Sequence, residues 1–457
     1  MFAKIYDTQI SYNYSDKYGF NRYPDDIMRE YVQSVEEGLD IEKHRAFFEQ
    51  VAAMENGEEK TAMSEKIFEI ILNADLRPDY KYNEPNELES IRNARQEYKI
   101  KGDMPDKDVL RSKIFGAWTG RAVGCLLGKS VEGARTDELI PLLKESGNYP
   151  MHRYILSTDV PREKRSQYKF YFNAPACADV VDGMPVDDDT NYVVLAQRIV
   201  EQFGKGFKSE DVANAWMRYQ SVFSYFTAER VAYVNFINCI EPPASAIYKN
   251  VCREWIGAQI RGDYFGYICP GEPEAAAEMA FNDARISHVK NGIYGEMLVS
   301  AMIACAAVTD NIEDIIKGGL AQIPAKSRLY EAVTRIMEDY KNGVTLEECY
   351  DYIHSVYDEH TDHGWCHVIS NAMIVTAALL YGEGDFGKSI CMAVQTAFDT
   401  DCNGATVGSI LGMRGGIDCI DDYWKKPVNG KIHTSIFGVG TVNIEDAVDK
   451  TMEHIEM

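Results

Sequence analysis

The sequence predicts an all-α fold, and two observations about its residue patterns support this prediction. Apolar residues recur at the spacing of a helix face in many segments, while runs with the alternation and β-branched residues of strands are scarce. Glycine, proline and aspartate cluster between these segments and indicate long loops. The helical patterns lie at residues 109–127, 191–203, 274–284, 294–308, 371–381 and 388–397.

The N-terminal quarter of the chain differs from the rest in composition. Residues 1–107 contain no cysteine, and charged helical patterns occupy residues 26–39 and 58–72. A polar, proline-bearing stretch at residues 76–87 indicates a linking region. We therefore expect an N-terminal helical extension over residues 1–107 and one helical domain over residues 108–457.

Charge and hydropathy argue against several classes of partner. The chain has 457 residues and a formal net charge of −24, so nucleic acid and anionic membranes would repel it. Its apolar runs, such as residues 297–308, are too short to cross a bilayer, and its start has no apolar stretch of signal-peptide length. Eleven cysteines without a CxxC pair indicate free thiols in a reducing compartment. We expect a cytoplasmic protein with no nucleic-acid or membrane partner.

Glycines recur at intervals of four residues in two of the helical segments. Each glycine inside a helix costs about 1 kcal/mol relative to alanine, so a compensating gain is expected. Residues four apart share a helix face, where a second backbone could approach closely. Such packing could bring Glu132 to Asp399 and Asp401, although packing alone would also explain the pattern. The glycines are Gly116, Gly120, Gly124, Gly128, Gly404, Gly408 and Gly412.

Residues 399–404 read DTDCNG, which is how a helix–loop–helix calcium loop begins. Such a loop needs a bidentate glutamate at position 12, where this chain has Ile410 and therefore no oxygen ligand. The following residues look like a packed helix with small residues at every fourth position. We therefore reject the calcium loop and interpret Asp399 and Asp401 as part of another kind of metal site.

A second group of carboxylates lies about two hundred residues earlier in the chain. Asp187, Asp188 and Asp189 precede a helical pattern, and helix capping is one interpretation of them. Capping needs only one aspartate, however, and three in a row repel each other. Together with Asp399 and Asp401 they could hold two adjacent divalent ions, and such ligands favour Mg²⁺, Mn²⁺ or Ca²⁺ over zinc.

Four segments resemble signatures of the ADP-ribosylglycohydrolase family, and the resemblance covers about residues 109–457. GRAVGCLLGKSVEG resembles the family's glycine-rich first helix, which ends in a glutamate, and VDDDTNYVV resembles its Asp-Asp-Thr motif. FDTDCNGATVGSILG resembles its Asp-Thr-Asp-Thr motif and the small-residue helix that follows. A weaker match is ICPGEPEAAAEMAFNDARISHVKNG, where the family has a proline-glycine turn, a helix and a histidine.

The resemblance implies an all-α domain with two Mg²⁺ ions in a cleft, Mn²⁺ being the alternative metal. Glu132 matches a glutamate that serves as ligand or general acid/base, and Asp189 is our second candidate for catalysis. Cys402 stands where the family has threonine, with Asn403 as the alternative ligand, and Cys125 stands where many relatives have aspartate. The implied metal ligands are Asp187, Asp188, Asp189, Asp399, Asp401 and Cys402.

Several further residues are candidates for binding substrate. His288 matches a histidine that lines the substrate pocket of the family. His367 and Asn371 lie four residues apart on one helix face, and we expect them in the pocket, with a helix cap as the alternative role of the histidine. The nearby run HTDHGWCH has no common zinc-ligand spacing. The full set of expected substrate-binding residues is Gly128, Lys129, His288, Asn403, His367 and Asn371.

The function implied by the resemblance is metal-dependent hydrolysis of an N- or O-ribosidic bond. The first expectation is an enzyme that removes ADP-ribose from a modified protein or small molecule. The family's glycine-rich phosphate loop should precede the ICPG turn, where this chain has IGAQIRGDYFG with fewer glycines. The alternatives are therefore hydrolysis of a smaller riboside or nucleoside, or a catalytically inactive binding protein.

Overall fold

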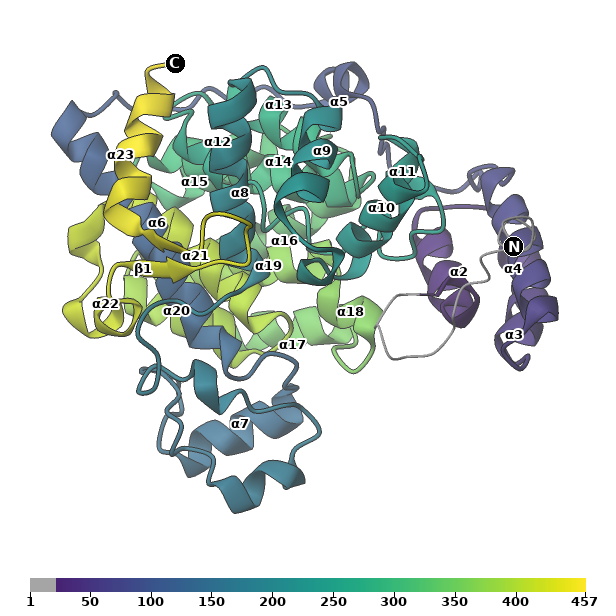
Figure 1. The fold of residues 1–457 in the computed structure, drawn as a ribbon, viewed down its shortest axis with the longest axis horizontal. Coiled ribbons are helices and arrows are strands. Elements are labelled where there is room, and N and C mark those ends of the chain that lie inside the picture. Colours follow the sequence, from purple (N-terminus) through teal and green to yellow (C-terminus); the bar gives the residue numbers. More distant parts are fainter. Residues whose placement is uncertain (1–21) are drawn as a thin grey trace, which may run out of the picture. The chain divides into compact units, whose positions relative to one another are not determined.

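Helices make up nearly all the regular structure of residues 22–457, which the computed structural model describes (Figure 1). In this part of the chain the named strands are β1 (Lys431–His433) and β2 (Thr441–Asn443), which form one antiparallel hairpin. No helix among the same residues is both long and apolar enough to cross a membrane. The all-α prediction is therefore confirmed.

Contacts within the chain define two compact units. The first consists of Met1–Tyr80 together with Lys249–Val251. The helices Ile27–Glu36 and Glu58–Leu72 form where the charged patterns predict them, whereas the helix Arg45–Ala52 lies outside both patterns. The predicted domain boundary at residue 107 stays a prediction. The elements are η2 (Tyr23–Asp25), α2 (Ile27–Glu36), η3 (Glu42–His44), α3 (Arg45–Ala52) and α4 (Glu58–Leu72).

The second unit consists of Lys81–Tyr248 and Cys252–Met457 and contains all the candidate site residues. Its short 3-10 segments are η4 (Arg162–Gln167), η5 (Ala174–Ala176), η6 (Val222–Ser224) and η7 (Ile417–Cys419). Its α-helices are α5 (Leu88–Ala94), α6 (Lys107–Lys129), α7 (Thr136–Glu145), α8 (Asp188–Phe203), α9 (Ser209–Tyr219), α10 (Thr227–Ile237), α11 (Ala244–Ile247), α12 (Asp263–Tyr267), α13 (Pro273–Ala284), α14 (Asn291–Ala306), α15 (Ile312–Leu320), α16 (Arg328–Lys341), α17 (Leu346–Val356), α18 (Asp362–Cys366), α19 (Val368–Tyr381), α20 (Phe386–Gln395), α21 (Thr400–Gly415), α22 (Asp422–Val428) and α23 (Ile444–Ile455).

Helices α14 and α19 lie in the interior of the second unit. Every residue of α14 is buried, and α19 is buried up to Leu380. A helix that is apolar on all sides is typical of a core position, as the apolar run at residues 297–308 predicts. Both helices pack against α21. Helix α21 is therefore surrounded by protein on several sides.

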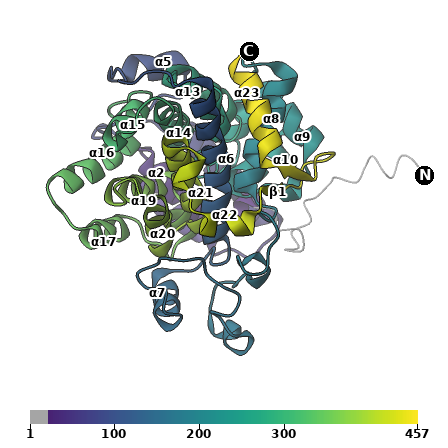
Figure 2. The same cartoon turned by 90° about the vertical axis from the view of Figure 1, so that its left-hand side faces the viewer.

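Helices α6 and α21 pack side by side, with their glycines facing each other (Figure 2). A Cβ atom added at Gly120 would come 2.1 Å from the carbonyl oxygen of Gly408, and one added at Gly404 would come 2.4 Å from that of Gly124. Both distances are shorter than any normal contact, so a larger residue would push the helices apart. The predicted close packing is confirmed. We call this contact the glycine seam; its pairs are Gly116–Gly412, Gly120–Gly408, Gly124–Gly404 and Gly128–Thr400.

The glycine seam determines which helix ends meet. Its pairs run in opposite directions along the two helices, so α6 and α21 are antiparallel. At the last pair, the Thr400 hydroxyl donates a hydrogen bond to the carbonyl oxygen of Gly128 at 3.0 Å. The turn after α6, which carries Glu132, therefore lies next to the N-terminus of α21, which carries Asp399 and Asp401.

Candidate active site

The N-terminus of α8 presents three aspartates, and only one of them caps the helix. Asp187 Oδ1 accepts a hydrogen bond from the backbone N–H of Asp189 at 2.9 Å. The capping interpretation therefore accounts for Asp187, whereas the side chains of Asp188 and Asp189 remain for other contacts.

The N-terminus of α21 is held by a tight turn and an asparagine. The two residues before Asp399, Ala397 and Phe398, both have positive φ angles of 60° and 57°, a conformation that is costly for side chains of their size. Asn371 Oδ1 accepts hydrogen bonds from the backbone N–H of Asp399 at 3.2 Å and from Asn403 Nδ2 at 2.8 Å. Asn371 thus positions the loop that carries the second group of carboxylates.

Side chains from α6, α8 and α21 converge in two groups that share Asp401. Ligand atoms of Cys125, Asp187, Asp189 and Asp401 all lie within 4.8 Å of one another. Those of Asp399, Asp401 and Cys402 do so as well. Among the described residues, Asp189 Oδ2 and Asp401 Oδ1 are buried side-chain oxygens without a hydrogen-bond partner. We call Asp187, Asp189, Asp399 and Asp401 the carboxylate centre.

Two basic residues of α6 partly neutralise the carboxylate centre. The Lys129 ammonium pairs with Asp187 through a short hydrogen bond. Arg121, which is buried, donates from Nη2 to Asp189 Oδ1 at 2.9 Å and from Nη1 to Asp263 Oδ2 at 2.8 Å. Each arrangement ties down one carboxylate oxygen and leaves negative charge in excess.

This excess charge and burial change the pKa values of the carboxyl groups. Burial raises the pKa of Asp189, Asp399 and Asp401, and neighbouring carboxylates raise each of them further. Burial also acts on Asp187, but Lys129 outweighs it and the pKa of Asp187 is lowered. Without added positive charge, the centre therefore retains protons that ordinary carboxyl groups release. Such a site would bind a divalent cation and lose protons in doing so.

Glu132 and Asp188 lie beside the carboxylate centre and belong to neither converging group. Glu132 is in the exposed turn after α6, and the charge of Asp401, followed by burial, raises its pKa. Asp188 is half-buried, and burial together with the charge of Asp187 raises its pKa. Both residues line the cavity described next.

A cavity of about 490 Å³ opens onto the carboxylate centre. This volume is within the range of small-molecule sites, and the wall combines carboxylates with apolar and aromatic side chains. The lining residues are Lys129, Glu132, Val186, Asp187, Asp188, Asn191, Phe223, Ser224, Phe226, Thr227, Glu229, Ile256, Gly257, Ile260, Trp365, Cys366, Asp399, Asp401, Cys402 and Ser435.

Several residues expected to bind substrate do not line this cavity. His288 is buried and its Nδ1 is 2.8 Å from Ser287 Oγ, while burial lowers its pKa. Gly128 lies in the glycine seam, and Asn403 bonds to Asn371. These residues and His367 are absent from the described lining, so their contact with substrate stays a prediction, whereas Lys129 does line the cavity.

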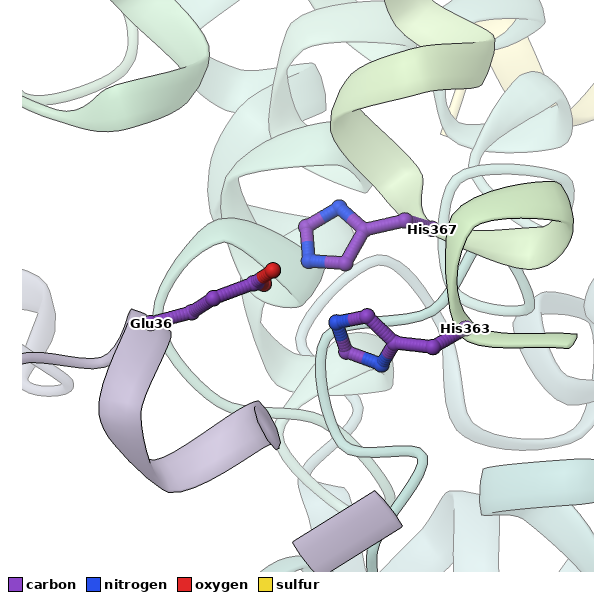
Figure 3. Close-up of side chains that lie close together, drawn as sticks. All are labelled: Glu36, His363 and His367. Carbon is purple, nitrogen blue, oxygen red and sulfur yellow. The ribbon is translucent and has the colours of Figure 1, made fainter. Parts of the chain in front are cut away.

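His367 also acts as a helix cap. Its Nδ1 accepts a hydrogen bond from the backbone N–H of Ile369 at 3.1 Å, at the start of α19. Figure 3 shows its ring close to that of His363, with ring centroids 5.0 Å apart. The ring of Tyr357 stacks on His367 at 5.4 Å. The helix cap, which the sequence left as the alternative role of His367, is therefore observed.

Three residues of the site were not among the expected site residues: Arg121, Cys125 and Glu229. Arg121, Cys125 and Lys129 are four residues apart, so one polar face of α6 points at the centre. That spacing was a usable signal inside the glycine-rich motif. Glu229, which lines the cavity, had no signal because nothing in its sequence neighbourhood marks it.

A cavity over converging carboxylates in a helical domain indicates a protein that binds a small molecule, and sequence comparison gives its family. The family model described as ADP-ribosylglycohydrolase matches residues 106–455. The chain belongs to the ADP-ribosylglycohydrolase family. A solved structure titled "ADP-ribosylglycohydrolase-related protein complex" is similar in fold: it has 16% identity and a TM-score of 0.50, and the match covers 77% of this chain and 99% of that one. No curated protein matches the chain significantly.

Proposed function

We propose that the chain hydrolyses a ribosidic bond in this cavity with the help of divalent cations. The observation that carries the proposal is the pair of buried, unpartnered oxygens, Asp189 Oδ2 and Asp401 Oδ1, within a cluster of carboxylates. Such groups are costly to bury unless a ligand satisfies them. Membership of the family supports a glycohydrolase reaction.

The residues present fit hard divalent cations such as Mg²⁺ or Mn²⁺. Oxygen donors predominate in both converging groups, and their spacing of at most 4.8 Å suits common coordination of one ion. Asp401 would be shared, and Cys402 and Cys125 are softer donors at the edge of each group. When bound, the cations supply positive charge that orients ribose hydroxyl groups and polarises water. The proposed ligands are Asp187, Asp188, Asp189, Asp399, Asp401 and either Cys402 or Asn403.

Side chains of the protein account for the remaining chemistry. Departure of the aglycone builds positive charge on the ribose ring oxygen and C1, which nearby carboxylates stabilise. Glu132 lines the cavity, the Asp401 charge raises its pKa in the metal-free protein, and it is our candidate for giving a proton to the leaving atom. A carboxylate of the centre accepts the proton of the attacking water. Asp189 remains the second candidate for this acid/base role, although Arg121 restrains it.

The energetic cost of the site argues against an inactive binding protein. The centre retains four mutually repelling buried carboxyl groups, and their raised pKa values record that cost for Asp189, Asp399 and Asp401. A site without a function would gain stability by losing Asp399 or Asp401, whose pKa values burial and neighbouring carboxylates raise. An enzyme acting on ADP-ribosylated protein or on a smaller riboside therefore remains the proposal.

The experiment is a substrate panel assayed with purified protein and Mg²⁺. ADP-ribosyl-arginine, an ADP-ribosyl-serine peptide and a set of nucleosides would be incubated separately, and released ribose or ADP-ribose measured. At least one of them should be cleaved. No release from any of them would contradict the enzymatic proposal.

Asp399→Asn tests the ligand assignment independently of activity. The variant should lose Mg²⁺ binding in isothermal titration, because a neutral amide replaces a charged ligand. Asp422→Asn, at a fully exposed aspartate, is the matched control and should bind like the native protein. An unchanged Mg²⁺ stoichiometry in Asp399→Asn would refute the role of this residue as ligand.

A further inference from the structure

The charged residues in the wall of the cavity are acidic, with one exception. Among the described residues that line it, Lys129 is the one lysine or arginine, and it pairs with Asp187. A substrate with a diphosphate group would therefore find no unpaired basic side chain in the lining, and Glu229, which is not among the proposed metal ligands, would repel it. The acidic lining residues are Glu132, Asp187, Asp188, Glu229, Asp399 and Asp401.

Glu229 occupies the place in this cavity that is best suited to an anion. It stands in the first turn of α10, where the Thr227 hydroxyl donates a hydrogen bond to its Oε2 at 3.4 Å. The N-terminus of a helix favours negative charge and is a common phosphate site. Here the protein's own carboxylate already takes that position.

The same carboxylate lies directly against Gly257. A Cβ atom added at Gly257 would come 2.0 Å from Glu229 Oε1, so no space is left over the glycine. A glycine permits a phosphate group to approach the backbone only if that space is open. The backbone at Gly257, within the segment IGAQIRG, is therefore closed to a phosphate by Glu229.

Arg261 holds Glu229 in this position and does not face the cavity. Its Nη1 donates to Glu229 Oε1 at 2.8 Å, and its Nε donates to Asp283 Oδ1 at 2.5 Å. The Arg261 guanidinium is buried and also stacks over Trp216. It is thus committed to the carboxylates of the protein.

Two other arginines contact aromatic residues of the lining. Arg230 lies over the ring of Phe226 at 5.0 Å, and Arg135 lies over that of Trp365 at 4.8 Å. Each also donates a hydrogen bond to a backbone carbonyl. These arginines support aromatic side chains and are not themselves among the lining residues.

We propose that the site takes a riboside that carries no phosphate and has a neutral or cationic aglycone, and that Glu229 excludes phosphate-bearing substrates. This inference rests on the ribosidic hydrolysis proposed above. The aromatic lining, with Phe223, Phe226 and Trp365, suits an apolar or planar aglycone, and the carboxylates favour a positive one.

Two matched substrate series test the proposal. The first is ADP-ribosyl-arginine with its 5-phosphoribosyl and ribosyl derivatives, which share one scissile bond and one leaving group. The second is NAD, nicotinamide mononucleotide and nicotinamide riboside. In a series that is cleaved, kcat/KM should be at least about tenfold higher for the phosphate-free member, because charge repulsion is absent. An equal or higher kcat/KM for the ADP-ribosyl member would overturn the proposal.

Glu229→Ala should open the anion position. The variant should bind ADP at least about tenfold more tightly than the native protein in isothermal titration, since a carboxylate no longer occupies the helix N-terminus. Glu229→Gln, which keeps the shape and removes the charge, should show a smaller gain. Glu347→Gln, at an exposed glutamate of α17, is the charge-matched control and should change nothing.

A second variant covers the case in which Glu229→Ala does not fold. Phe223 is 53% exposed, so Phe223→Lys adds a positive charge to the lining without disturbing the core, and it should also tighten ADP binding. Unchanged ADP affinity in the folded Glu229 variants and in Phe223→Lys would overturn the exclusion by charge. If no ribosidic substrate is cleaved at all, the proposed function fails, while the ADP titrations still test the role of Glu229.

Discussion

The glycine seam and the carboxylate centre are adjacent, yet they contribute to stability with opposite signs. In the seam, backbone atoms of α6 and α21 approach closely, and every group is small and uncharged. At the centre, a few residues further along the same helices, buried carboxyl groups repel each other. The seam stabilises the fold, whereas the centre costs stability and provides the site.

This difference indicates that the stability gained in the seam offsets the stability lost at the site that the seam positions. Close backbone packing gives α6 and α21 one register, because glycine meets glycine at three of the four pairs. That register places Asp401 next to Cys125 and the end of α6, where Asp187 and Asp189 of α8 also converge. Substitutions in the seam should therefore destabilise the protein, and substitution of Asp401 in the centre should strengthen the fold while removing metal binding.

The largest effect is expected in the seam, from Gly408→Leu. The added side chain would collide with the backbone of Gly120, where even a Cβ would come 2.1 Å from the carbonyl oxygen. Overpacking against backbone should lower the free energy of unfolding by more than about 3 kcal/mol, measured by urea denaturation. Gly206→Ala, which has no heavy atom within 4 Å of the added Cβ, is the control. If Gly408→Leu were as stable as the native protein, the close packing of α6 and α21 at Gly120 and Gly408 would be contradicted.

A smaller loss is expected where the two regions meet, from Arg121→Met. The substitution leaves Asp189 and Asp263 buried without their shared cation, which should destabilise the fold by about 3 kcal/mol. Arg335→Met, which breaks a half-exposed pair with Asp339, should cost less than about 1 kcal/mol. The comparison uses metal-free protein at neutral pH. Equal losses in the two variants would show that Arg121 is not needed to offset the centre.

The smallest effect, of opposite sign, is expected in the centre from Asp401→Asn. Removing one repelling charge should raise the free energy of unfolding of the metal-free protein by about 1 kcal/mol near pH 8. Burial and Asp187 raise the pKa of Asp401 in the folded state, so the folded protein binds the proton more tightly than the unfolded chain. The tighter proton binding therefore stabilises the native protein at low pH. This stabilisation is lost as the pH rises from about 4, the ordinary pKa of an aspartate, through the raised pKa of Asp401.

The pH dependence provides the measurement for this third prediction. The stability difference between Asp401→Asn and the native protein should be close to zero near pH 4 and grow toward pH 8, in thermal denaturation at several pH values. Asp422→Asn, at an exposed position, should show no such trend. A difference that shrinks with rising pH would mean that the Asp401 carboxylate is stabilised in the fold.

Local spacing explains which parts of the fold and site could be predicted. Gly116 to Gly128 and Gly404 to Gly412 revealed a close helix contact because residues four apart share one face. The same rule would have identified Cys125 as part of the polar face of α6. By contrast, the hydrogen bonds of Asn371 to the α21 loop join residues that no local pattern connects.

The sequence by itself determined the helical class, the glycine seam and the two groups of aspartates, because each depends on the spacing of residues within one segment. Only the tertiary structure decided that Lys129 forms an ion pair with Asp187 and that Arg121 forms one with Asp189. The same holds for the contact of Glu229 with Gly257. These contacts join segments distant in the chain, and their energies depend on distance and burial, which the order of residues does not contain.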